Sequence, residues 1–88
     1  MNFLKFDLGQ QNAGASAVVS LSGVESDVFL VDPTNLGSFE RGQRFSYYGG
    51  HYKIRHVRLS VPTSGHWYLV VAPIGGTVSA SVEVIGVS

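Results

Sequence analysis

The stretch that decides the fold is "HVRLSVPTSGHWYLVVAP", residues 56–73. Between positions 57 and 61 every second residue is apolar, which is the period-two signal of a half-buried β-strand. A turn follows, because Pro62 supplies the fixed φ of a type I turn and Gly65 accepts a left-handed conformation. Residues 66–73 then form a second apolar strand. The stretch therefore predicts two strands joined by a tight turn.

The same alternation recurs along the chain. It predicts further strands at residues 3–8, 15–23, 27–32, 43–48 and 77–87. About seven or eight short, mainly antiparallel strands at this spacing predict one compact all-β sandwich over residues 1–88. The positions expected in its core are Leu21, Leu30, Phe45, Val57, Leu59, Trp67, Leu69, Val71 and Val82.

One segment, residues 33–41, breaks the strand pattern. Asp32 suits a helix N-cap, Pro33 suits the first helical position and Gly42 suits the end of a helix, so one or two helical turns are expected. Asp32 and Asn35 could instead offer oxygen ligands to calcium. The proline at the first helical position favours capping.

The segment "FSYYGGHYKI", residues 45–54, is expected to be a hairpin around a two-residue turn at Gly49–Gly50 with positive φ. Tyr47 would then lie opposite Tyr52, and Arg44 opposite Arg55. This register directs Phe45, Tyr47, Tyr52 and Ile54 to the core, and Arg44, Ser46, Tyr48, His51, Lys53 and Arg55 outward. A β-bulge at Arg55–His56 is needed to keep both Ile54 and Val57 inside.

Composition excludes several classes of protein. The 88 residues are 44% hydrophobic and 14% charged, with zero formal net charge and no cysteine. The balanced charge argues against a general nucleic-acid binder, and the missing thiols exclude disulfides and cysteine ligands. No apolar run reaches the length of a signal peptide or a membrane span, so a cytoplasmic location is expected.

The basic residues are unevenly distributed. Five of the six lie within residues 41–58, a range that contains no acidic residue. The hairpin register would gather most of them on one face beside an aromatic ring, which predicts a site for an anionic small molecule or an acidic protein partner. The candidate ligand-binding residues are Arg44, Tyr48, His51, Lys53, Arg55 and Arg58. The alternative is a solvated face whose positive charges discourage aggregation at sheet edges.

The sequence carries no recognisable catalytic motif. There is no nucleophile elbow, phosphate-binding glycine loop or zinc-protease motif. His51, His56 and His66 lack the spacing of a metal site, and the serines lack a spaced base. We therefore expect no enzyme activity, no metal and no cofactor. Trp67 alternates with apolar neighbours, which favours a core position over a binding platform.

Five blocks of the sequence resemble one family. They are "MNFLKFDLG", "VSLSG", "DPTNLGSFERG", "YYGGH" and "VRLSVPTSGHWYLVV". In this order they are similar to the bacterial family called domain of unknown function 1883, from Met1 to about Gly76. The resemblance implies a small all-β sandwich, in some proteins joined to a Toll/interleukin-1 receptor domain, and it implies no catalytic residue. His56 stands where that pattern leads us to expect proline.

A shorter likeness covers the Asp-x-x-Asn-Leu segment and the following Gly-aromatic strand. It is similar to sandwich domains of the Golgi-dynamics type, which bind proteins or lipids. The sequence as a whole therefore predicts a non-catalytic module for ligand or partner recognition, monomeric or weakly self-associating. The alternative is a structural or self-assembly module that uses the edges or faces of the sandwich.

Overall fold

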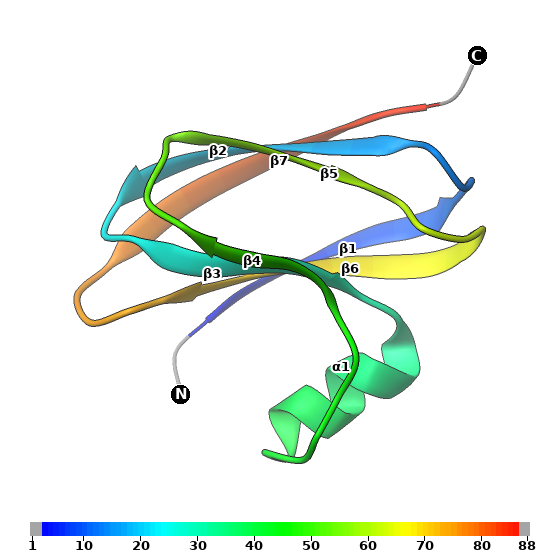
Figure 1. Cartoon of the computed structure of the whole chain (residues 1–88), viewed down its shortest axis with the longest axis horizontal. Coiled ribbons are helices and arrows are strands. Elements are labelled where there is room, and N and C mark those ends of the chain that lie inside the picture. The colour runs from blue at the N-terminus through cyan, green and yellow to red at the C-terminus, as the bar shows by residue number, and fades with distance from the viewer. Residues whose placement is uncertain (1–2, 87–88) are drawn as a thin grey trace.

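Two antiparallel sheets pack face to face, and one helix lies outside them (Figure 1). The computed structural model describes residues 3–86. The strands run in the order β1-β6-β3-β4 in one sheet and β5-β2-β7 in the other. The elements are β1 (Leu4–Gln11), β2 (Ser16–Gly23), β3 (Ser26–Val31), α1 (Pro33–Glu40), β4 (Tyr48–Tyr52), β5 (His56–Ser60), β6 (Gly65–Pro73) and β7 (Val78–Ile85). The predicted all-β sandwich with one short helix is confirmed.

Strands that follow one another in the chain mostly lie in different sheets. The connections before and after β2 both cross the sandwich, as do those that enter β5, β6 and β7. β3 and β4 are consecutive strands that do pair, and α1 lies between them in the sequence. Nearly every ladder therefore joins distant parts of the chain.

The predicted hairpin at residues 45–54 is wrong. Gly49 and Gly50 lie within β4, opposite Phe29 and Val28 of β3. Gly49 has φ +156°, whereas Gly50 has no positive φ, so the primed turn is not formed. A Cβ on Gly49 would overlap the Val28 carbonyl oxygen and lie 2.7 Å from the Phe29 Cα. The glycine is thus needed for the close approach of two strands.

The cross-strand partners expected from that hairpin are also wrong. Residues 53–55 carry the chain from β4 in one sheet to β5 in the other, so Arg44 does not face Arg55 and Tyr47 does not face Tyr52. Ile54, expected in the core, lies in this connection and is 60% exposed. The crossing also removes the need for a bulge at Arg55–His56; a register shift occurs instead in β1, between Asp7 and Gly9.

The core between the sheets agrees closely with the prediction. Leu21, Leu30, Val57, Leu59, Trp67, Leu69 and Val71 are all buried. Val82 is partly buried against this cluster, and Phe45 belongs to a second cluster on the outer face of the four-stranded sheet. The Trp67 indole Nε1 donates to the Thr63 carbonyl oxygen at 2.8 Å, so its one polar atom is satisfied.

Helix α1 covers part of the outer face of the four-stranded sheet, on the side away from the other sheet (Figure 1). Asp32 is its N-cap, as predicted, because the Asp32 Oδ1 accepts from the Asn35 backbone N at 2.8 Å. The Asn35 Oδ1 in turn accepts from the Ser46 N at 2.8 Å. The cap therefore also anchors residues 43–47, the segment that leads from α1 to β4.

Candidate functional site

The six residues predicted to bind a ligand do not share one face. Tyr48 lies opposite Leu30 and packs edge-on against Trp67, with ring centroids 5.8 Å apart. His51 lies opposite Asp27 and hence on the other face of β4. The expectation that Tyr48 and His51 border one basic surface is therefore wrong, and the misplaced hairpin is the cause.

His51 and Lys53 lie among acidic side chains. The His51 Nε2 is 3.2 Å from Glu25 Oε2, and its Nδ1 is 3.0 Å from Asp27 Oδ1. Lys53 Nζ is 3.7 Å from the same Glu25 oxygen. Hydrogen bonds to Glu25 and then Asp27 raise the pKa of His51, and the bond from His51 lowers the pKa of Glu25. The positive charges of His51 and Lys53 are thus compensated by Glu25 and Asp27, which lie just before and at the start of β3. Residues 41–58 contain no acid, so the sequence of that range alone could not reveal this.

Arg44 and Arg58 lie apart from this cluster. Arg44 is exposed in the segment between α1 and β4. Arg58 projects from β5 on the other sheet, opposite Val18, whose partner on its far side is Glu83. An acid in the same row of the sheet makes Arg58 part of an ordinary mixed-charge surface.

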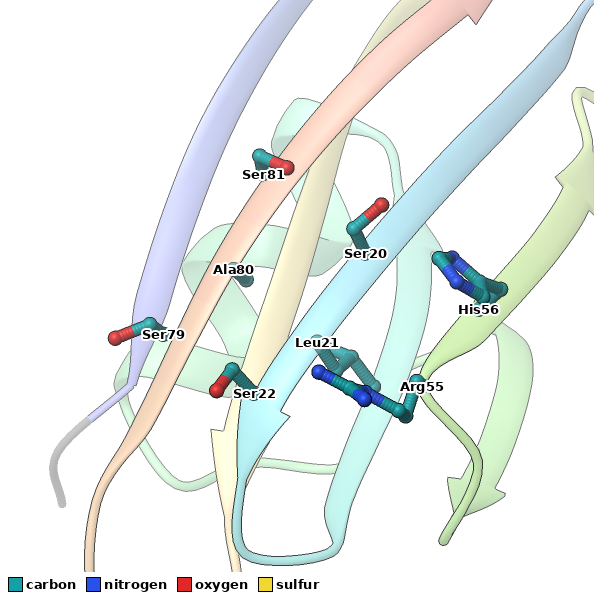
Figure 2. Close-up of a pocket in the computed structure, with 8 residues that line it drawn as sticks. All are labelled: Ser20, Leu21, Ser22, Arg55, His56, Ser79, Ala80 and Ser81. Carbon is teal, nitrogen blue, oxygen red and sulfur yellow. The ribbon is translucent and has the colours of Figure 1, made fainter.

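Arg55 lines two pockets that lack acidic groups, and it shares the smaller one with Lys53. In the larger one it is the only one of the six predicted residues. The cavity, about 350 Å³, lies on the outer face of the three-stranded sheet. It is lined by Ser20, Leu21, Ser22, Arg55, His56, Ser79, Ala80 and Ser81 (Figure 2), and we call it the serine hollow.

Strand register brings the four serines together. Ser20 has His56 as its partner on β5 and Ser81 on β7. Ser22 faces Ser79 across the same ladder. Because directly opposite residues point to the same side of a sheet, the four hydroxyls and the imidazole share the outer face.

The main chain fixes where the Arg55 side chain begins. The Leu21 N donates to the Arg55 carbonyl oxygen at 2.7 Å, which ties the start of β5 to the end of β2. From there the guanidinium extends towards Ser22 across β2, while the His56 ring lies on the β5 side of Ser20 (Figure 2). A guanidinium, an imidazole and hydroxyl groups thus border one shallow hollow, all of them hydrogen-bond donors suited to an oxyanion.

Sequence reasoning missed the serines as site residues. The runs "SAVVSLSG" and "SASV" place them outward on two strands, but nothing local indicates that β2 and β7 are neighbours. Within residues 3–86 no group of three or more His, Asp or Glu side chains is placed to hold a metal ion, and no helix is long and apolar enough to cross a membrane.

Comparison with known proteins gives one family. The model described as "Domain of unknown function (DUF1883)" matches residues 1–87. No curated protein and no solved structure matches the chain.

Proposed function

We propose that this chain, which belongs to the family described as Domain of unknown function (DUF1883), is a non-catalytic recognition module that binds an oxyanion in the serine hollow. The observation that carries the proposal is the joint position of Arg55 and His56 with four serine hydroxyls in a pocket whose lining has no carboxylate. The proposed ligand is anionic, as predicted from the sequence. Of the six residues predicted to bind it, only Arg55 lies in the serine hollow.

The chemistry of the lining favours an anion over other ligands. A guanidinium offers donors in a planar fork that matches a carboxylate or a phosphate, and charge-assisted hydrogen bonds are about twice as strong as neutral ones. Serine hydroxyls add donors that rotate to suit the ligand. The hollow is open, so binding is expected to be weak and to fall with added salt, since exposed charges are screened over about 8 Å at physiological ionic strength.

A titration with inorganic phosphate and a nucleoside monophosphate at low salt tests the proposal. We expect the amide signals of residues 20–22, 55–56 and 79–81 to shift in nuclear magnetic resonance spectra. Arg55→Ala should weaken binding by roughly 10- to 100-fold, because a hydrogen bond to a charged group contributes about 1.5–3 kcal/mol. Arg44→Ala is the matched control, since it removes the same charge from a distant exposed position.

An equal loss of phosphate affinity in Arg44→Ala and Arg55→Ala would mean that only the net charge of the protein matters. That result would contradict a defined binding site. Absence of any shift with phosphate at low salt would also contradict it. His56→Ala and Ser20→Ala should each weaken binding less than Arg55→Ala, because each leaves in place the guanidinium and its fork of donors.

Self-assembly is the second candidate, and the position of β7 supports it. β7 is the terminal strand of the order β5-β2-β7 and has eight residues, long enough to pair with another copy of the chain. Light scattering at high protein concentration separates the two functions, because a strict monomer contradicts assembly. A bacterial origin, a cytoplasmic location and association with Toll/interleukin-1 receptor domains stay predictions from the sequence.

A further inference from the structure

A second cavity lies on the opposite side of the molecule from the serine hollow. It occupies about 430 Å³ on the outer face of the four-stranded sheet, beside the segment between α1 and β4. Small residues, Gly50 of β4 and Ala72 of β6, leave room in the sheet, and Asp27 and His51 also border the cavity. We call it the aromatic cavity.

Four aromatic rings form its remaining lining: Phe29, Phe39, Phe45 and Tyr47. The centroids of Phe29, Phe45 and Tyr47 lie 5.3–5.6 Å apart, and the three ring planes are inclined to one another by 40–56°. Phe39 packs edge-on against Phe29 and Phe45. The four rings thus pack against one another and also line the cavity, and each ring has a negative electrostatic potential on its face.

Packing of the helix accounts for only part of this cluster. Phe29 is buried at 4% exposure, and Leu36 and Val70 complete the contact between helix and sheet. Tyr47, by contrast, is 51% exposed and contributes its ring beside the open cavity. The neighbouring Ser46 N donates to the Asn35 Oδ1 of α1, and this hydrogen bond holds the segment that carries the Tyr47 ring.

Negative charge borders the same cavity. The Asp27 side chain is 46% exposed. The His51 ring lies between Asp27 and Glu25, with one ring nitrogen bound to each carboxylate. Lys53 contacts Glu25 and not Asp27 among the ion pairs of the described residues. The Asp27 Oδ1 is bound to the His51 Nδ1 at 3.0 Å, so its charge is partly compensated there, and the side chain is still partly exposed at the border of the aromatic cavity.

We propose that the aromatic cavity binds a small organic cation of the alkylammonium class, such as a trimethylammonium group. Such a cation is weakly hydrated, so it gains from apolar walls, from the faces of aromatic rings and from a nearby carboxylate at the same time. The cavity volume falls within the range of about 300–1,000 Å³ typical of ligand pockets. An anion would meet the Asp27 carboxylate, and a neutral apolar ligand would make no use of it.

Choline and its uncharged analogue 3,3-dimethylbutanol provide the test, because they share a shape and differ in charge. We expect choline, at millimolar concentrations, to shift the amide signals of Asp27, Gly50 and Ala72. The neutral analogue should bind at least several-fold more weakly. A peptide that contains trimethyl-lysine distinguishes a side chain from a free small molecule as the source of the cation.

Three variants locate the site. Tyr47→Leu should weaken choline binding by about 3- to 30-fold, the equivalent of one cation–π contact. Asp27→Asn should weaken choline without affecting 3,3-dimethylbutanol. Tyr48→Leu is the matched control, because this tyrosine is similarly exposed but lies on the other face of β4. Unchanged amide spectra away from each mutation confirm that the variants fold.

Equal binding of choline and 3,3-dimethylbutanol would overturn the proposal, as would equal weakening by Tyr47→Leu and Tyr48→Leu. Absence of amide shifts at 100 millimolar choline, roughly the limit of a useful affinity, would overturn it too. These outcomes are independent of phosphate binding in the serine hollow, which lies on the other sheet.

Discussion

Gly49 has no Cβ, and this allows β4 to lie close to β3. A pair of glycines between aromatic residues satisfies the local criteria of a hairpin turn, so the sequence alone predicts a turn here. The tertiary reason for the glycine, the Val28 carbonyl oxygen directly beside it, comes from a strand about twenty residues earlier and leaves no local pattern.

Gly49→Ala should therefore destabilise the protein, while Gly50→Ala should not. The new methyl group at position 49 would meet the backbone of β3, which must shift, at a cost of about 1–3 kcal/mol. A Cβ on Gly50 meets no atom within 4 Å. Chemical denaturation of both variants checks the difference. Equal stability of the two would mean that β4 is not held against β3 as described.

His51 should make the stability of the fold depend on pH. Its pKa is raised by Glu25 and Asp27, so its contribution is fully present below the ordinary histidine pKa of 6.5 and is lost as pH rises through the raised value. The pKa of Glu25 is lowered, so its contribution is present above 4.5 and lost as pH falls. The pair thus stabilises most between about pH 5 and 6.5.

Unfolding experiments at pH 6 and pH 9 measure this effect. The stability difference between the wild type and His51→Gln should shrink at the higher pH. His56→Gln, on the other sheet, is the matched control for the loss of a histidine. A constant difference for His51→Gln across this range would show that the ring is not protonated between the two carboxylates.

At the scale of the element, α1 was predictable because its signals are local. Asp32 and Pro33 define the start of the helix whatever surrounds them, and both have the predicted roles. The segment at residues 43–47 was predicted as a strand, yet it is irregular and its course depends on a hydrogen bond to Asn35. Long-range anchoring of this kind is invisible to periodicity.

Removal of the cap should destabilise this element. Asp32→Ala deletes the acceptor for the Asn35 N and should cost about 0.5–2 kcal/mol, while Asp32→Asn should keep most of the stability. Thr34→Ala, at an exposed position of the same helix, is the control. Amide exchange should also quicken at Ser46, because Asn35 loses its support. A fully stable Asp32→Ala variant would contradict the capping role.

At the scale of the whole molecule, the two faces of most strands were predictable, with β4 the exception, and the neighbours of each strand were not. Alternation follows from the backbone geometry of a strand, so Leu59 and Leu69 were assigned inward correctly. Pairing depends instead on which strands meet in the folded chain. His51 and Arg58 were consequently assigned to one surface, although β4 and β5, which carry them, belong to different sheets.

The buried position of Trp67 makes this residue important for the stability of the whole domain. Trp67→Ala should cost about 3–5 kcal/mol, a large part of the stability of a small domain, because it removes a buried indole from the cluster between the sheets. Trp67→Phe should cost less, since it keeps an aromatic ring and loses the bond to the Thr63 oxygen. Circular dichroism is the measurement of choice, because both variants lose the single tryptophan fluorophore. Near-normal stability of Trp67→Ala would contradict a core role.

The crossing of the chain between the sheets also determines how the molecule must acquire its structure. Leu4 lies opposite Val71, and Ser16 lies opposite both Ser60 and Ile85, so no ladder forms from neighbouring residues alone. A long loop has to close before any pair of strands stabilises it, and folding of such β-rich topologies takes milliseconds to seconds. During synthesis on the ribosome, β1 pairs only after the residues around Val71 have been made, whereas β2 can pair with β5 earlier and gains β7 last. Each sheet is therefore completed only when one of the last two strands, β6 or β7, has been made.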